Sequence, residues 1–165
     1  MPTGRGGARF YVDESALGLG KILARARRDV VHPGHRLLPE IPPGTLDPDW
    51  MPIVASLDLV VISRDRHIKT KPAELRLYHE HGLRAFWIAG RKDMDNWGNL
   101  DRIVRAWGQI EALVELRGAG PWFYALTEGA IKEIPVRPPP GTSRMSPDPT
   151  QRQDVDSRPA DRDGR

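Results

Sequence analysis

The hydrophobic residues of this chain form two alternating patterns: short continuous apolar runs, and longer stretches whose apolar positions recur at helical spacing. The continuous runs, typical of strands covered on both faces, lie at residues 9–12, 29–32, 57–64 and 84–90. The stretches with helical spacing lie at residues 16–28, 47–57, 71–81 and 96–117. A last apolar stretch, residues 122–136, is typical of a hairpin that turns near Glu128 and Gly129.

Strands that alternate with helices predict an α/β fold, a three-layer sandwich around a mainly parallel sheet. The right-handed connections of such a sheet bring the carboxyl ends of its strands to one edge. Ligands bind in the crevice beyond that edge. The residues that directly follow each apolar run are therefore the first candidates for a functional site.

Local signals predict where the helices begin and which side chains they bury. Ser15 is the expected N-cap of the helix at 16–28, and Asp47 followed by Pro48 suits the N-cap and first position of the next helix. Three tryptophans stand at helix-face spacing and are expected in the core, namely Trp50, Trp97 and Trp107.

The ends of the chain differ in composition from its centre. Residues 138–165 have no aromatic and almost no aliphatic residue, so they cannot bury enough apolar surface to offset the entropy lost on ordering. We expect a disordered tail there, a flexible N-terminus at 1–8 and one folded domain at 9–137.

Composition limits the class of protein. The chain has no cysteine, which excludes a disulfide framework and a thiolate metal site and fits a reducing compartment. It has no apolar run of membrane-spanning length and no signal-peptide pattern at its N-terminus, so a cytoplasmic location without a membrane partner is expected. Its 25 basic residues, mostly arginine, are compatible with a polyanionic partner and equally with a GC-rich genome.

Acidic residues follow two of the predicted strands. Asp13 follows the first run and Asp65 follows the third, so both are expected at the binding edge. Asp49 at the start of the second helix is a candidate to join them, and Glu14 beside Asp13 either joins them or points to solvent. Like charges in a desolvated crevice repel one another, and a divalent cation is the usual compensation. Ligands that are all oxygen favour Mg²⁺ or Mn²⁺ over zinc.

Four segments together resemble the PIN-like nuclease domains, in the branch near the VapC-like toxins of toxin–antitoxin pairs. These are "FYVDES", "DVVHPGHRLLPEIPPGTLDPDW", "VVISRDRHI" and "GLRAFWIAG", and the resemblance spans about residues 9–117. It implies an endoribonuclease that depends on Mg²⁺ or Mn²⁺, with Asp13, Asp49 and Asp65 as its catalytic, metal-binding acids. The family commonly has a fourth acid or hydroxyl, for which the candidates are Glu14, Glu40 and Asp95.

Cations surround Asp65 in the sequence. Arg64, Arg66, Lys69 and Lys71 would lie where an RNA backbone approaches a metal at Asp65, and contacts to phosphate supply most non-specific affinity. The alternative is that they only solvate a loop or neutralise Asp65. The resemblance also implies a cognate antitoxin, which would fill or block the acidic crevice; a homodimer is compatible with the sequence.

Two other functions compete with the nuclease. One is a PIN-like module without catalysis that only binds nucleic acid or protein. The other is a receiver-like domain controlled by phosphorylation, which also has acids after its first strand and an aspartate after a later one. Against the receiver, the strand at 84–90 supplies no lysine at its end, where a receiver is expected to have one.

Overall fold

The computed structural model describes residues 4–64, 70–90, 94–135 and 137, where strands and helices alternate as predicted. The strands are β1 (Phe10–Val12), β2 (Val30–Val31), β3 (Val60–Ser63), β4 (Arg84–Ile88), β5 (Trp122–Leu126) and β6 (Ile131–Glu133). The helices are η1 (Arg5–Gly7), η2 (Glu14–Ala16), α1 (Leu17–Ala26), α2 (Asp47–Ser56), α3 (Pro72–Glu80) and α4 (Asn96–Arg117). The predicted tail at 138–165 lies outside the described residues.

The six strands form one sheet in the order β2-β1-β3-β4-β5-β6. The first five are parallel, with Phe10 paired to Val30 on one side and to Val60 on the other. β6 runs antiparallel to β5 as the second arm of the predicted hairpin. The order reverses at β1, because the chain passes from β2 back across β1 to form β3. Such a reversal leaves a crevice at the carboxyl ends of the two strands that flank it.

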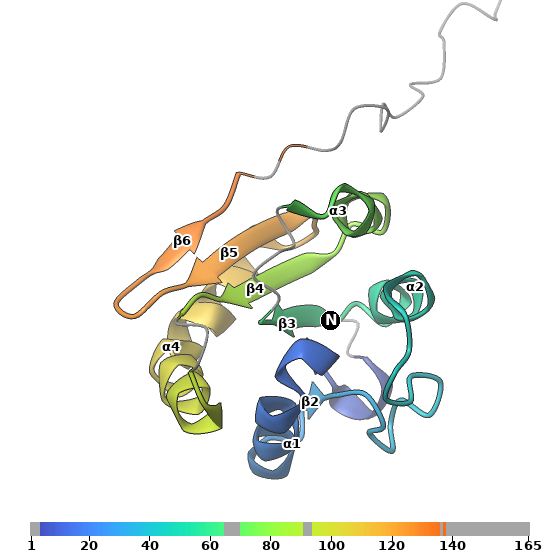
Figure 1. Cartoon of the computed structure of the whole chain (residues 1–165), viewed down its shortest axis with the longest axis horizontal. Coiled ribbons are helices and arrows are strands. Elements are labelled where there is room, and N and C mark those ends of the chain that lie inside the picture. The colour runs from blue at the N-terminus through green and yellow to red at the C-terminus, as the bar shows by residue number, and fades with distance from the viewer. Residues whose placement is uncertain (1–3, 65–69, 91–93, 136, 138–165) are drawn as a thin grey trace, which may run out of the picture.

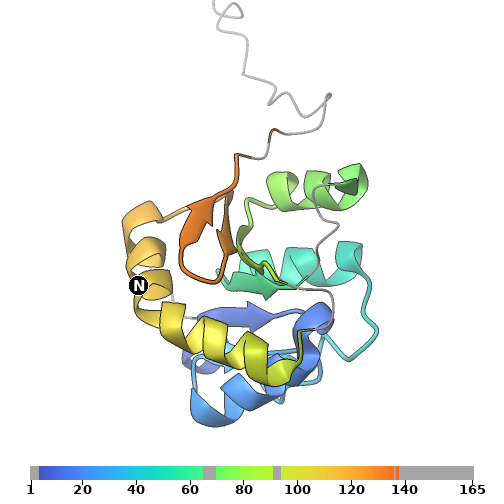
Figure 2. The same cartoon turned by 60° about the vertical axis from the view of Figure 1, so that its left-hand side comes forward.

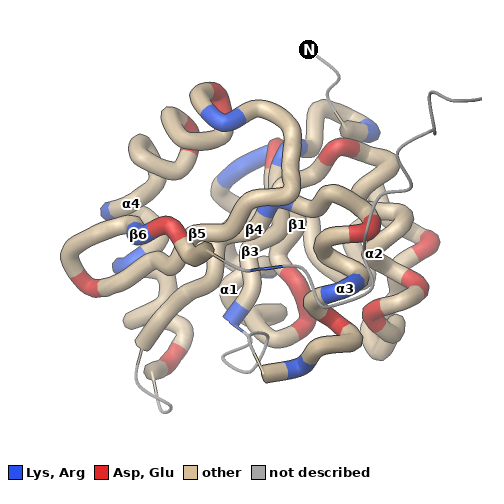
Figure 3. The backbone as a smooth tube through the Cα atoms, turned by 90° about the horizontal axis from the view of Figure 1, so that it is seen from above, with Lys and Arg blue, Asp and Glu red and all other residues tan. Residues whose placement is uncertain are grey.

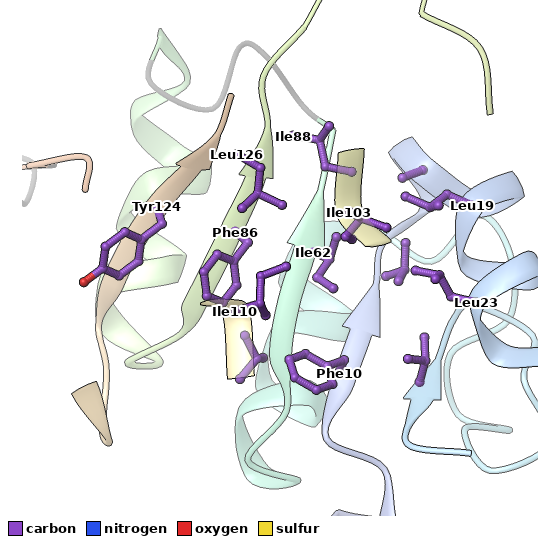
Figure 4. Packing of buried hydrophobic residues seen from close by; sticks show 14 of the residues in the cluster. Phe10, Leu19, Leu23, Ile62, Phe86, Ile88, Ile103, Ile110, Tyr124 and Leu126 are labelled. Carbon is purple, nitrogen blue, oxygen red and sulfur yellow. The ribbon is translucent and has the colours of Figure 1, made fainter. Parts of the chain in front are cut away.

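Helices cover both faces of the sheet, so the predicted three-layer α/β fold is confirmed (Figure 1). On one face, α1 and α4 pack Leu19, Leu23 and Ile103 against side chains that include Phe10 and Phe86 (Figure 4). On the other face, the apolar side chains of α2 and α3 meet the alternate strand residues. Both faces are apolar because every residue of a central parallel strand is buried.

Helix α4 has the predicted bounds but not the predicted burial. Ile103 and Ile110 are fully buried, and Trp107 is half-buried with its ring centroid 4.9 Å from that of Phe10. Trp97, predicted in the core, is 74% exposed, and Val104 one heptad later is 59% exposed. The prediction was wrong for Trp97 because its flank of the helix turns away from the sheet.

The described residues before β1 pack in part against the domain. Within the predicted flexible segment 1–8, η1 forms a single turn and Ala8 is 2% exposed in the core.

Over the described residues, no helix has the length and apolar character that a membrane crossing requires.

Candidate functional site

Asp13 lies at the point where the strand order reverses. It directly follows β1, is 9% exposed, and its backbone amide donates to the carbonyl of Ile62 in β3 at 3.0 Å. That bond extends the pairing of β1 and β3 by one residue, so the carboxylate stands beside the end of β3. A charged side chain this buried requires hydrogen-bond donors or a counter-ion.

Ser15 links Asp13 to the end of β3. The Ser15 hydroxyl donates to Asp13 Oδ1, lies 3.3 Å from the Ser63 hydroxyl and accepts from the Arg64 amide at 2.8 Å. The Ser15 amide also donates to Asp13 Oδ1, at 3.1 Å. The predicted N-cap role of Ser15 was therefore wrong: α1 begins at Leu17, after the turn η2, and no side chain caps it. Ser15 instead orients the acid and the start of the next loop.

A cavity of about 220 Å³ opens at this edge of the sheet. Its lining includes Tyr11, Asp13, Glu14, Asp47, Trp50 and Lys71. Figure 3 shows the acidic stretch between α1 and α3, with a basic residue at the start of α3. The crevice expected from the strand order thus exists, and carboxylates and a lysine line it.

Asp47, rather than Asp49, is the acid that α2 contributes to the cavity. Its side chain accepts from the indole Nε1 of Trp50 at 2.8 Å, so it is not the N-cap; that position belongs to Leu46, which makes no side-chain cap. Asp49 is exposed and is not among the residues of the lining. Residues two apart on a helix point about 200° apart, so both cannot face one cavity. The three-residue spacing of Asp47 and Trp50 could have predicted their hydrogen bond from the sequence. The prediction of Asp47 as an N-cap assigned its carboxylate to another role.

The electrostatic environment of Tyr11 shows that three acids gather here. Burial raises the pKa of the Tyr11 hydroxyl, and the negative charges of Asp13, Glu14 and Asp47 raise it further. Charges act on one buried hydroxyl in this way only when they are close to it. The three carboxylates, from two different elements, therefore contribute negative potential to one small volume.

Glu14, predicted as a metal ligand, also has a structural role. Both of its carboxylate oxygens accept from the backbone amide of Gly44, at 2.8 and 3.1 Å. Gly44 has a φ of +86°, which glycine adopts without strain. Glu14 thereby fixes the loop that leads into α2 and brings Asp47 to the cavity.

The other two candidates for a fourth acid are engaged away from the cavity lining. Glu40 pairs with Arg5 at 2.6 Å on the surface. Asp95 is the N-cap of α4 and accepts from the Gly98 amide at 2.8 Å. Each carboxylate therefore has a structural role of its own, as an ion-pair partner or as a helix cap.

Of the predicted RNA-binding cations, Arg64 and Lys71 are described. The Lys71 ammonium group lies 3.1 Å from a Glu74 carboxylate oxygen, and the residue lines the cavity just before α3. Asp65, Arg66 and Lys69 lie outside the described residues.

Within the described ranges, no three histidine, aspartate or glutamate side chains are close enough together to form a metal-binding group.

A family model identifies the fold independently of this geometry. The model for the PIN-like domain matches residues 8–90, half of the chain. The chain belongs to the PIN-like domain family. The match runs from just before β1 to just after β4 and so includes the reversal of strand order, the cavity and its acids. Among curated proteins and among solved structures, no match was found.

Membership of the PIN-like family decides between the competing fold-level interpretations. The strand order 2-1-3-4-5 also occurs in flavodoxin-like folds, so topology alone does not separate a nuclease from a receiver. PIN-like domains are commonly nucleases that use divalent metals, and the family match therefore supports a hydrolase.

Proposed function

We propose that this PIN-like domain is a metal-dependent endoribonuclease whose site is the cavity at the ends of β1 and β3. The observation that carries the proposal is the cavity where the strand order reverses, whose lining includes Asp13, Glu14 and Asp47. Ligands of open α/β sheets bind at such a reversal. Like charges that share a cavity repel one another, and a bound cation would offset that repulsion.

The donor set fits a hard divalent cation. Mg²⁺ in phosphoryl-transfer sites is commonly held by one or two carboxylates, with waters and substrate phosphates completing its shell. Asp13 and Asp47 would supply the two carboxylates, and Asp65 is proposed from its place in the sequence as a third. When bound, such a cation lowers the pKa of a water and offsets the negative charge that develops on a phosphodiester.

The chain's own residues orient this site. Ser15 holds the Asp13 carboxylate through its hydroxyl and its amide, and the indole of Trp50 holds that of Asp47. These donors are neutral, so the two contacts orient the carboxylates and themselves add no positive charge. Lys71 brings a positive charge to the rim, where an RNA phosphate would approach, and Arg64, Arg66 and Lys69 are proposed to extend that contact.

Cleavage of labelled single-stranded RNA by the purified full chain tests the proposal. We expect cutting with Mn²⁺ or Mg²⁺, none with EDTA, and a loss of at least about 100-fold in Asp13→Asn, since the variant retains shape but lacks the charge. The circular dichroism spectrum of Asp13→Asn should match that of the unchanged chain. RNA binding without cutting under any metal would instead identify an inactive binding module.

A narrower part of the same proposal is a toxin of the VapC-like branch with a cognate antitoxin. The acidic cavity would accept an antitoxin arginine, which pairs with carboxylates in a bidentate manner. Expression in a bacterial host should arrest growth, and Asp13→Asn should relieve the arrest. Normal growth at equal protein levels, with cleavage intact in vitro, would reject toxin status and keep the nuclease.

A further inference from the structure

Trp97 is a large apolar side chain left in solvent. It stands in the first turn of α4 and is 74% exposed, whereas the other four tryptophans of the chain are buried or half-buried. Burying such a side chain stabilises a protein by roughly 1.5–3 kcal/mol, so its exposure forgoes a sizeable gain. Tryptophan is the residue most suited to a surface that meets a flat, partly polar ligand.

The beginning of α4 lies against the beginning of α1. A Cβ atom added to Gly18 would stand 2.5 Å from Nδ2 of Asn96, so the Asn96 side chain packs directly over the backbone of α1 at Gly18. Figure 2 shows the start of α4 next to the segment that leads into α1. Both helices follow parallel strands, β1 and β4, and so begin at the edge that carries Asp13. Trp97 therefore stands at the same edge of the sheet as Asp13, on the side that α1 and α4 cover and outside the cavity lining.

Two cations lie further along α1, which runs from this edge of the sheet toward the other, with Arg25 in its last turn. Lys21 and Arg25 stand three and seven residues after Gly18, which places all three on one face of the helix. Both side chains are exposed, and neither makes a hydrogen bond or ion pair within the described part of the chain. Like charges four residues apart disfavour a helix by a few tenths of a kcal/mol, a cost that a polyanion would reverse.

We infer that Trp97, Lys21 and Arg25 form a binding surface for the single-stranded RNA that flanks the phosphodiester to be cut. The inference rests on the proposed function and adds to it a surface that holds the substrate. An unpaired base stacks on the exposed indole, and the neighbouring phosphates contact the two cations. Bases of a duplex are already stacked on one another, so the surface selects single strands.

Binding measured without cleavage tests the surface apart from the nuclease. The probe is a short fluorescein-labelled single-stranded RNA, titrated with full-length protein in EDTA and followed by anisotropy. Trp97→Ala should weaken binding about tenfold, because base–aromatic stacking contributes roughly 1–3 kcal/mol. Leu116→Ala is the matched control: it removes an equally exposed apolar side chain, 79% exposed, from the last turn of the same helix.

The salt dependence of the same titration tests the cations. Replacing Lys21 and Arg25 by alanine together should reduce the slope of log K against log salt by about 1.4, roughly 0.7 for each contact to a single strand. Lys132→Ala should leave the slope unchanged, because this exposed cation belongs to β6, the outermost strand on the side of the sheet away from β1 and β2.

Three results would overturn the inference. One is unchanged RNA affinity in Trp97→Ala, and another is an equal loss in the Leu116 and Lys132 controls. The third is a Trp97→Ala variant that alters self-association in sedimentation but not RNA binding, since a second copy would then cover the indole. RNA cleavage by the unchanged chain alongside any of these would leave the nuclease intact. RNA binding through this surface without metal-dependent cleavage would support the surface and reject the nuclease.

Discussion

The carboxylates at the two edges of the sheet have different kinds of hydrogen-bond partner. At the amino edge, acids meet arginines: Asp58 lies 2.8 Å from Arg84, and Asp29 lies 2.8 Å from Arg27. At the carboxyl edge, the hydrogen bonds between described residues give Asp13, Glu14 and Asp47 neutral donors, a serine, a glycine amide and an indole. Figure 3 shows acidic and basic stretches on several sides of the molecule, so charge as such does not separate the two edges.

The partners of the carboxylates indicate different roles for the two edges, stability at one and function at the other. A carboxylate paired with arginine has its charge largely compensated and gains mainly structural cohesion. Hydrogen bonds from neutral donors orient a carboxylate and themselves add no positive charge to it. The amino edge is therefore expected to determine stability, and the carboxyl edge to determine activity. Each of the following substitutions tests one side of that division.

The largest expected effect separates two acids of one helix. Asp47→Asn should reduce metal-dependent RNA cleavage about 100-fold, or ~2.7 kcal/mol, whereas Asp49→Asn should change it less than about threefold. Both substitutions remove one charge from the start of α2, so they match in their effect on the helix dipole. Initial rates with saturating Mn²⁺ decide between them. A larger loss in Asp49→Asn would return the catalytic role to the residue predicted from the sequence.

At the amino edge, Arg84→Met should lower stability and leave activity unchanged. The Arg84 guanidinium donates to the Asp58 carboxylate, and its side chain is 10% exposed. Its loss leaves Asp58, with φ +54°, without that partner and should cost about 1–3 kcal/mol of unfolding free energy. Urea unfolding measures the cost. A fall in the cleavage rate of the folded variant would break the division between the edges.

Ser15→Ala tests the positioning of Asp13. The variant loses the hydroxyl that donates to Asp13 and accepts from the Arg64 amide. Residues that orient metal-binding acids typically affect metal affinity about 10-fold or more, so the Mg²⁺ concentration for half-maximal cleavage should rise about tenfold. Ser56→Ala is the control, since that hydroxyl bonds only within α2, to the Ile53 carbonyl. Equal metal requirements in the two variants would exclude a positioning role for Ser15.

The smallest effect concerns acid sensitivity at the carboxyl edge. Burial, assisted by the positive charges of His32 and Arg36, lowers the pKa of His35 in the loop after β2. A histidine whose pKa is lower in the folded chain binds its proton better when unfolded, so stability falls as the pH drops below about 6.5. His35→Asn keeps an acceptor for the Leu37 amide and should flatten that fall. Thermal unfolding between about pH 7 and 5 measures it, and an unchanged slope would contradict the assignment.

Local pattern was sufficient for most of the fold. The apolar runs predicted the strands, and helical spacing predicted α4 with its bounds at Asn96 and Arg117. Asp13 was found because a charge directly after a buried strand is costly, a signal that sequence alone carries. Its expected neighbour Asp65 lies outside the described residues, so that pairing stays a prediction.

What failed was the assignment of side chains whose role depends on contacts distant in sequence. Ser15 has the residue type of a helix cap, and only the packing of β3 against β1 gives it Ser63 and Arg64 as partners. Asp47 bonds Trp50 within its own helix, and only tertiary packing places it in the same cavity as Asp13. Trp97 has core spacing, yet α4 covers the sheet with a neighbouring face. Sequence determined the order of elements, because periodicity and turn residues act over a few positions. Tertiary structure decided which acids share a cavity and which tryptophan faces solvent, because those outcomes depend on how separate elements pack.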